Sequence, residues 1–206
     1  IALVDIGAGT SDIAISSKDS ISSYGMVPQA GDEVTEAIAQ ECLVDFNTAE
    51  YIKRNLLLSD EITYTDVIGL ENNVKSENIL KSIKPIVKKI AESIGTKIIE
   101  LNANKPPSAL FLVGGGAHTP GLINELSEIL NIPIQRIAIK DRNAIENCIS
   151  DNNLGSAGVT VLGIALTSIK NGDNDFIEVT LNSSEVTLFN SHNHTVMDAI
   201  IHAGIN

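Results

Sequence analysis

The first fifteen residues restrict the fold of this chain more than any other segment. Residues 1–4 are apolar and residues 12–16 alternate polar with apolar side chains, so both segments are predicted to be β-strands. The turn between them contains Gly7 and Gly9, whose missing Cβ atoms let backbone N–H groups approach an anion closely. The pattern predicts a phosphate-binding turn. The alternative is an ordinary glycine-containing β-hairpin.

Two polar side chains beside this turn suit a bound phosphate. Asp5 lies at the mouth of the turn, and proteins usually hold Mg²⁺ through one or two carboxylates, often with water between. Thr10 offers a hydroxyl to a phosphate or to water. We therefore predict Asp5 and Thr10 as catalytic residues, with Asp5 holding Mg²⁺ through water.

The composition limits the partners of this chain. Its 206 residues are 43% hydrophobic and carry a formal net charge of −12. A surface this acidic repels nucleic acid and anionic lipid, so we expect no nucleic-acid partner. No apolar run is long enough to span a bilayer and no leader pattern is present, which predicts a cytoplasmic protein without a membrane segment. Its cysteines, Cys42 and Cys148, are expected to be reduced thiols.

The rest of the chain alternates strand and helix patterns. The predicted strands are 20–28, 109–113 and 134–137. The predicted helices are 31–43, one capped by Asn47 or Thr48 that runs to about 58, 76–102, one that starts at Thr119-Pro120 and carries 122–130, and 156–169. Pro85 and Gly95 are candidate kinks in the long third helix.

A polar break at residues 170–175 divides the chain. We predict that residues 1–170 form one α/β domain, with a small subdomain excursion around 31–105. Residues 176–206 are predicted to form a β-hairpin and a helix capped by Thr195, an order that resembles the start of a β-grasp domain. Because Ile1 already belongs to a strand, we expect the chain to be a piece of a longer protein.

A second glycine site follows the apolar strand 109–113. Gly114, Gly115 and Gly116 come directly after this strand and precede a helix, which puts backbone amides at the carboxyl edge of the sheet, where α/β proteins bind ligands. One such loop is weak evidence. Two sites on one domain predict a shared cleft, in which one loop holds phosphates and the other borders a base or ribose.

These motifs together resemble the actin and heat-shock-chaperone ATPase superfamily. The two nucleotide signatures are residues 5–10 and 112–117, and segments 29–38 and 48–54 resemble helices that reach the nucleotide from the side. The combination is most similar to the bacterial division actins of the FtsA family, with PilM-like proteins as the alternative. The resemblance implies a ribonuclease-H-like actin-type ATPase domain, the second of two lobes, that binds ATP and Mg²⁺.

The resemblance also implies roles for individual residues. The residues it assigns are Gly7, Gly9 and Thr10 on the phosphates, Glu50 and Lys53 on the adenosine sugar or base, and Gly115, Gly116 and His118 beside the adenine. Ala8 stands where the family more often has glycine, and Ala30-Gly31 replaces a common glycine pair, so we expect a slightly less open approach for the phosphates than in the family.

The functional expectation follows from these roles. We predict the nucleotide-binding half of an FtsA-like ATPase, with a cell-division or assembly role, ATP or ADP as ligand and a protein partner such as a filament subunit, a division protein or a client. The alternatives are an ATP-dependent chaperone or enzyme-reactivating factor, a small-molecule kinase and a nucleotide-free scaffold. Since the first lobe is not part of this chain, we expect it to bind ATP weakly and not to hydrolyse it.

Two other clusters receive less weight. His192, His194 and His202 lack a completing acidic or thiol ligand at a recognisable spacing, so we do not predict a metal site there. Lys84, Lys88 and Lys89 are predicted to lie on a solvated face of the long helix.

Overall fold

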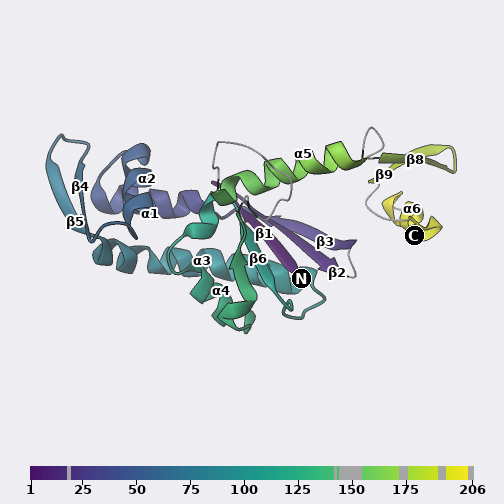
Figure 1. The fold of residues 1–206 in the computed structure, drawn as a ribbon, viewed down its shortest axis with the longest axis horizontal. Coiled ribbons are helices and arrows are strands. Elements are labelled where there is room, and N and C mark those ends of the chain that lie inside the picture. The colour runs from purple at the N-terminus through teal and green to yellow at the C-terminus, as the bar shows by residue number, and fades with distance from the viewer. Residues whose placement is uncertain (18–19, 142, 144–154, 172–175, 190–193, 204–206) are drawn as a thin grey trace.

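The main feature of the fold is one mixed five-stranded sheet in the order β3-β2-β1-β6-β7 (Figure 1). The computed structural model describes residues 1–17, 20–141, 143, 155–171, 176–189 and 194–203. The strands of the sheet are β1 (Ala2–Ile6), β2 (Ser11–Ser17), β3 (Ser20–Val27), β6 (Leu110–Val113) and β7 (Ile137–Ile139). β1 pairs antiparallel with β2 and parallel with β6, so the first strand lies at the centre.

Helices and two small hairpins complete the described chain. The helices are α1 (Gly31–Cys42), α2 (Phe46–Asn55), α3 (Ser76–Leu101), α4 (Leu122–Leu130), α5 (Val159–Asn171) and α6 (Val196–His202). The 3₁₀ turns used below are η1 (Gly115–His118), η2 (Ile134–Arg136) and η4 (Gly155–Gly158). The hairpins are β4 (Glu61–Thr65) with β5 (Glu71–Lys75), and β8 (Phe176–Leu181) with β9 (Ser184–Phe189). The predicted α/β class is therefore confirmed.

The core lies on one face of the sheet. The register places apolar side chains side by side across the three central strands, so that Val4 pairs with Ile13 on β2 and with Leu112 on β6. All three are buried, and α3 packs against this face at β2 and β3. The alternate residues of β1 and β3 point the other way, and there Tyr24 stays 83% exposed. Burying an aliphatic side chain of this size contributes roughly 1.5–3 kcal/mol, so this apolar layer is the main source of stability.

The long helix α3 runs from the β4–β5 hairpin to the sheet (Figure 1). Its buried residues recur every three or four positions and include Ile83, Val87, Ile90 and Ile94. The helix is continuous through Pro85 and Gly95, which the sequence marked as candidate kinks. Gly95 lies at the contact between α3 and α4, where a Cβ would be 2.5 Å from Cγ2 of Ile129. Glycine therefore allows the two helices to approach closely.

Several predicted boundaries are wrong by a few residues. α2 starts after Asp45, not Asn47 or Thr48, because the Asp45 carboxylate accepts the N–H groups of both residues at 2.8 and 3.0 Å. α4 starts after Gly121, in a left-handed conformation, instead of at Thr119-Pro120. The predicted strand 134–137 is mostly the turn η2, and the strand β7 follows it. α5 begins only after the turn η4, three residues later than predicted.

The C-terminal hairpin and α6 form a small separate unit at the far end of α5 (Figure 1). The buried side chains of this unit are Val186, Leu188 and Ala199, and they share no residue with the main core. Thr195 caps α6 by accepting the N–H of Asp198, as predicted. The comparison of this unit with a β-grasp domain remains a prediction.

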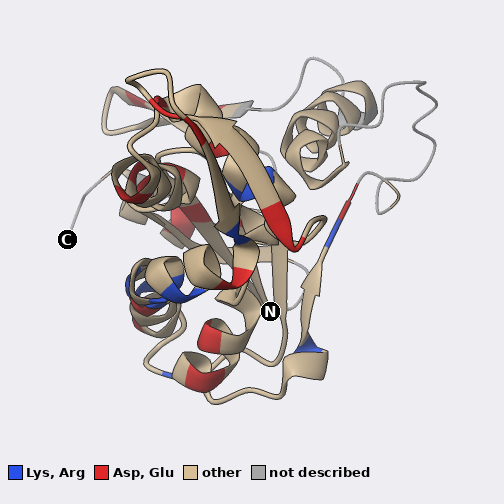
Figure 2. Cartoon of the chain, turned by 90° about the vertical axis from the view of Figure 1, so that its left-hand side faces the viewer, with Lys and Arg blue, Asp and Glu red and all other residues tan. Residues whose placement is uncertain are grey.

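The surface agrees with the acidic composition. Acidic side chains are spread over several elements of the face in Figure 2 instead of forming one cluster. Lys84, Lys88 and Lys89 are exposed on α3, so the predicted solvated face is confirmed. None of the helices in the described part of the chain has the length and apolar character needed to cross a membrane.

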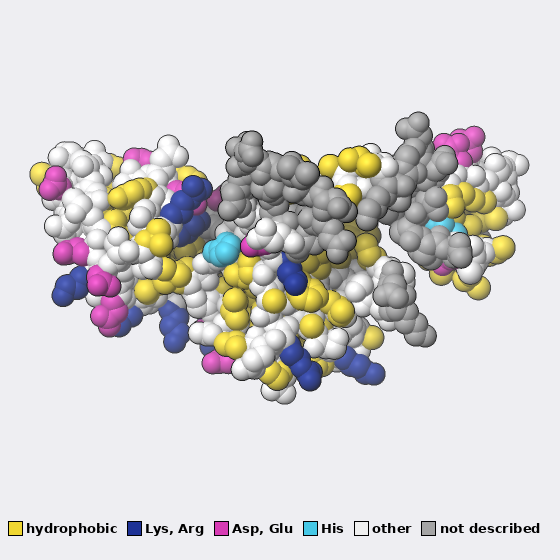
Figure 3. Space-filling model, viewed as in Figure 1, with side chains coloured by type: hydrophobic (Ala, Val, Ile, Leu, Met, Phe, Trp, Pro, Cys, Tyr) yellow, Lys and Arg dark blue, Asp and Glu magenta, His cyan; other side chains and the backbone are white. Residues whose placement is uncertain are grey.

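Large apolar side chains are exposed at the end that carries α1, α2, β4 and β5. Figure 3 shows yellow side chains on this end of the molecule and over the sheet. Those exposed at this end are Leu43, Phe46, Tyr51, Leu57, Leu58, Val67, Ile68 and Leu70. Cys42 is buried beside them and free, and burial raises the pKa of its thiol, which keeps it protonated and unreactive. Cys148 lies outside the described residues.

Candidate functional site

The turn between β1 and β2 is closed by backbone hydrogen bonds. The N–H of Gly7 donates to the carbonyl of Thr10 at 2.9 Å. The first amides of α1 then bond to the same turn, from Gly31 to the carbonyl of Gly7 at 3.2 Å and from Asp32 to that of Ala8 at 2.8 Å. The turn is therefore joined to the N-terminus of α1, and both elements face the same side of the molecule.

The second glycine segment packs directly against this turn. Gly114 has φ +86°, and a Cβ there would overlap the carbonyl oxygen of Ile6 and Oδ1 of Asp5. A Cβ on Gly116 would lie 3.0 Å from the carbonyl oxygen of Gly7. Glycine is required at both positions by the close approach of β6 to the end of β1. The predicted convergence of the two glycine segments is thus present in the fold.

A polar network joins α1 to α2 beside the turn. Lys53 Nζ donates to Thr35 Oγ1 at 2.6 Å and to the carbonyl oxygen of Gly31 at 3.1 Å, and it forms an ion pair with Glu50 at 2.7 Å. Thr35 Oγ1 donates to Glu50 Oε2 at 2.8 Å. Arg54 adds a bond from Nε to Glu50 Oε1 at 3.1 Å. The network fixes the Lys53 and Glu50 side chains next to the first turn of α1.

The network also sets the charge of Glu50. Burial would raise the pKa of this carboxyl group, but the hydrogen bonds from Lys53 and Thr35, the charge of Lys53 and the bond from Arg54 together outweigh burial and lower the pKa. Glu50 is therefore ionised at neutral pH. The Lys53 and Glu50 side chains are only 15% and 26% exposed, so their attraction is less screened than that of a surface pair.

These segments surround one cavity of about 980 Å³. The predicted site residues on its wall are Asp5, Gly7, Glu50, Lys53, Gly115, Gly116 and His118. Gly9 and Thr10 belong to the same turn but are exposed outside this wall. The structure thus brings together residues from β1, α2 and η1 that lie far apart in the sequence. Their contacts with a nucleotide remain predictions.

Several residues of this region were not predicted from the sequence. Phe46, Leu57 and Leu58 add apolar surface to the cavity, and Ser156 lines it from η4. Thr160 reaches Asp5 from the first turn of α5. No local motif marks these residues, because they become neighbours of the glycine turns only through the fold.

The donor set of the cavity fits a magnesium nucleotide. Asp5 provides one carboxylate, and Mg²⁺ needs one or two carboxylates in addition to phosphate oxygens and water. A Cβ on Gly115 would meet no atom within 4 Å, so the backbone there borders open space. Within the described ranges, no three His, Cys, Asp or Glu side chains lie together as a metal cluster. Asp32 and Glu50 also lie on the cavity wall, and Asp5 is the carboxylate that the sequence predicts for the metal, together with oxygens of its ligand.

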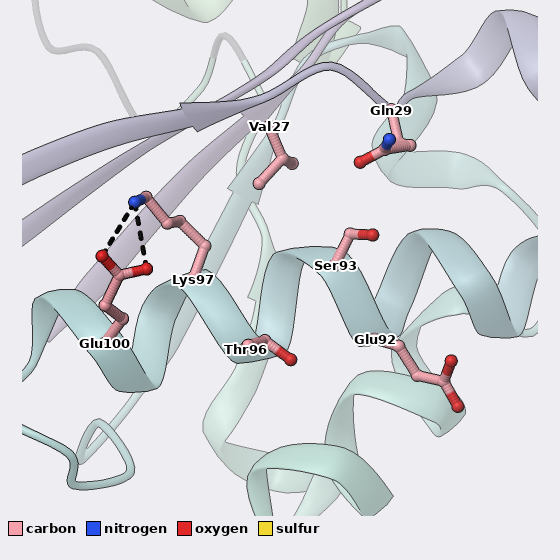
Figure 4. Close-up of a pocket in the computed structure, with 7 residues that line it drawn as sticks. All are labelled: Val27, Gln29, Glu92, Ser93, Thr96, Lys97 and Glu100. Atoms are coloured by element: carbon pink, nitrogen blue, oxygen red, sulfur yellow. Dashed lines mark hydrogen bonds and ion pairs between the residues drawn. The ribbon is translucent and has the colours of Figure 1, made fainter.

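A second hollow of about 370 Å³ lies between the end of β3 and α3 (Figure 4). It contains none of the predicted site residues; it is lined by Val27, Gln29, Glu92, Ser93, Thr96, Lys97 and Glu100. Lys97 forms an ion pair with Glu100 at 3.0 Å, one turn along the same helix. The cation in this hollow is already paired, and we assign no ligand to it.

The fold and the site define the class of protein. A mixed sheet with a central N-terminal strand and two converging glycine segments at one cavity agree with an actin-type ATPase domain. The family described as "Cell division protein FtsA" matches residues 2–163. This chain belongs to the FtsA family.

Curated relatives agree with this assignment. The chain is 25% identical to the cell division protein FtsA of Bacillus subtilis over 139 residues, which cover 63% of this chain and 32% of that protein. It is 27% identical to the cell division protein FtsA of Buchnera aphidicola over 188 residues, which cover 80% of this chain and 43% of that protein. The chain thus spans less than half the length of these relatives.

Solved structures share the fold. The "PilM-PilN type IV pilus biogenesis complex" aligns with a TM-score of 0.57 at 21% identity, over 82% of this chain and 45% of that one. MreB 5 of Spiroplasma citri, bound to AMPPNP, aligns with a TM-score of 0.55 at 22% identity, over 84% and 54%. At these identities the similarity establishes the actin-like fold and no more.

Proposed function

We propose that this chain is the nucleotide-binding second lobe of a two-lobed, FtsA-like ATPase that acts in cell division or assembly in the cytoplasm. The observation that carries the proposal is the single cavity shared by Asp5, Gly7, Lys53 and Gly115, which come from distant parts of the sequence. The solved relative with AMPPNP supports a nucleotide as the ligand of such a cavity.

Each residue of the site has a proposed role. Asp5 orders Mg²⁺ through water, and the turn with Gly7, Gly9 and Thr10 meets the phosphates through the backbone amides that remain once the N–H of Gly7 has bonded to the carbonyl of Thr10. Glu50 and Lys53 contact the sugar or base, while Gly115, Gly116 and His118 border the adenine. The roles of Gly9 and Thr10 rest on their place in the turn, since neither lies on the cavity wall.

The second lobe supplies only part of the chemistry of hydrolysis. Phosphoryl transfer to water needs an attacking water held in line and neutralisation of the charge that develops on the phosphate oxygens. Mg²⁺ supplies charge neutralisation when it is bound. Asp5 holds the ion, and the first lobe provides the remaining groups. We therefore expect this lobe alone to bind ATP weakly and to leave it intact.

A protein partner is part of the proposal. The PilM–PilN complex is a solved example of this fold with a protein bound to it. If the two-lobed protein forms filaments, ATP will increase the fraction that sediments. Release of a bound client on ATP addition, without sedimentation, will instead support the chaperone alternative.

Calorimetry with ATP and Mg²⁺ tests the proposed site. The two-lobed protein is expected to bind ATP, and Lys53→Ala is expected to weaken binding at least tenfold because Lys53 lies on the cavity wall. Lys97→Ala is the matched control, since this lysine lies in the second hollow and its loss is expected to leave affinity unchanged. Absence of ATP binding by the two-lobed protein, or rapid hydrolysis by this lobe alone, would overturn the proposal.

A further inference from the structure

The first turn of α5 and the turn before it hold the ends of two neighbouring strands. Thr160 Oγ1 donates to Asp5 Oδ2 at 2.5 Å, at the end of β1. Ser156 Oγ donates to the carbonyl oxygen of Gly114 at 2.8 Å, and the N–H of Gly114 donates back to the carbonyl oxygen of Ser156 at 3.0 Å. Residues 155–160 therefore contact the end of β1 at Asp5 and the second glycine segment at Gly114.

These contacts restrict the carboxylate of Asp5. Its Oδ2 atom accepts the Thr160 hydroxyl, and its Oδ1 atom lies against the backbone of Gly114, where a Cβ would overlap it. A hydroxyl that donates to an ionised carboxylate forms a short and strong hydrogen bond. The bond also places Asp5 beside the second residue of α5, near the positive end of the helix dipole. The orientation of the Asp5 side chain is thus set from α5.

We propose that Thr160 is a positioning residue for Asp5, holding this carboxylate in the orientation that receives the Mg²⁺ of a bound nucleotide. The inference rests on the proposed function, and it adds a residue that lies 155 positions away in the sequence. Mg²⁺ demands near-ideal octahedral geometry, so a rotated carboxylate weakens its hold on the ion. Thr160 acts through Asp5, and its loss leaves the contacts of the base and ribose in place.

The test separates metal-dependent from metal-independent binding of ATP. In the two-lobed protein, affinity is measured by calorimetry with Mg²⁺ and with EDTA for the wild type, Thr160→Val and Thr160→Ser. Valine matches threonine in shape but has no hydroxyl. It is expected to reduce the gain in affinity from Mg²⁺ by about tenfold, as loss of a partner that orients a metal ligand does, with affinity in EDTA within about twofold of wild type. Serine restores the hydroxyl and is expected to restore the gain.

Three results would overturn the inference. One is an unchanged Mg²⁺ effect in Thr160→Val. Another is an equal loss of affinity with Mg²⁺ and with EDTA, which indicates a purely structural role. The third is a wild-type protein that binds no ATP, which removes the proposed function as well and so differs from the first two. Thermal unfolding without nucleotide checks that each variant is folded, and Thr160→Ala takes the place of the valine variant if valine prevents folding.

Discussion

Gly114 is the most constrained residue at the candidate site. It adopts φ +86°, a conformation that L side chains rarely take, and it lies against the backbone of Ile6 and the side chain of Asp5. Its neighbour Gly115 has a negative φ and open space around the position of a Cβ. Two adjacent glycines therefore differ in purpose, since the first is required by the fold and the second leaves room in the cavity.

Alanine substitutions separate these purposes. Gly114→Ala is expected to lower the free energy of unfolding by roughly 2–4 kcal/mol, because it combines backbone strain with steric overlap. Gly115→Ala is expected to change it by less than about 1 kcal/mol. Urea denaturation of both variants measures the difference, and similar values for the two would contradict the close approach seen at Gly114.

Glu50 gives a prediction that depends on pH. Its pKa is lowered in the folded protein, so its ionised form stabilises the fold above the ordinary value of 4.5, and this contribution is lost as the pH falls through the lowered value. Glu50→Gln is therefore expected to be less stable than wild type at pH 7 by about 1–2 kcal/mol. The difference is expected to shrink steadily below pH 4.5. Urea denaturation at a series of pH values measures it, and a difference independent of pH would contradict the network.

Residues of the site could be predicted where the chemistry is local. Asp5 and Gly7 lie within one strand and turn, so their spacing predicts an anion site, with an ordinary glycine-containing hairpin as the alternative. Thr160 and Ser156 belong to a segment of small residues without a motif. They become recognisable as site residues only in the folded protein, where Thr160 contacts Asp5 and Ser156 contacts Gly114. Contacts between distant segments leave no spacing signal in a single sequence.

At the scale of elements, the contact between α3 and α4 depends on Gly95. A Cβ atom added to Gly95 would lie 2.5 Å from Cγ2 of Ile129, which is shorter than a normal contact between two carbon atoms. Packing of this kind depends on the shape of both helices. A bulkier residue on one helix requires a smaller one on the other.

A double-mutant cycle measures this dependence. Gly95→Ala is expected to destabilise the protein by roughly 1–3 kcal/mol through overpacking, although alanine is the better helix former. Ile129→Ala removes the Cγ2 atom in question, so the double variant is expected to be more stable than the sum of the single effects predicts, by at least about 0.5 kcal/mol. Strict additivity of the two changes would show that the helices do not press on each other here.

The long helix was predictable, whereas the ends of several shorter elements were not. The apolar period of α3 is sustained over 26 residues, which is why its extent follows from the sequence. The start of α2 was misplaced because Asp45, Asn47 and Thr48 are all good cap residues, and only the three-dimensional path of the chain selects Asp45. The short strand β7 was displaced for a similar reason, since three residues carry too little pattern to locate it.

At the scale of the whole molecule, two hydrophobic cores are separate. The main core includes the sheet, α1, α2, α3 and α4, whereas the second consists of Val186, Leu188 and Ala199 with a few partly buried neighbours. The polar run at residues 170–175 predicts a domain boundary between the two, and that boundary stays a prediction.

Removal of residues 172–206 tests this independence. The truncated chain is expected to keep the unfolding transition of the main core, with a change in free energy below about 1 kcal/mol, because no buried residue of that core is lost. Far-UV circular dichroism during urea denaturation follows this transition. A loss of cooperative unfolding on truncation would show that the two cores depend on each other.

The bonds from Gly31 and Asp32 to the carbonyls of Gly7 and Ala8 hold the shape of the turn at which we propose that a phosphate binds. The first amide donors of α1 are already committed to the turn, so the loop has its final shape before any anion arrives. Ordering a flexible loop on binding reduces affinity, and here that entropy is lost during folding instead. If a phosphate group binds at this turn as proposed, it meets a loop whose backbone is already held by these bonds.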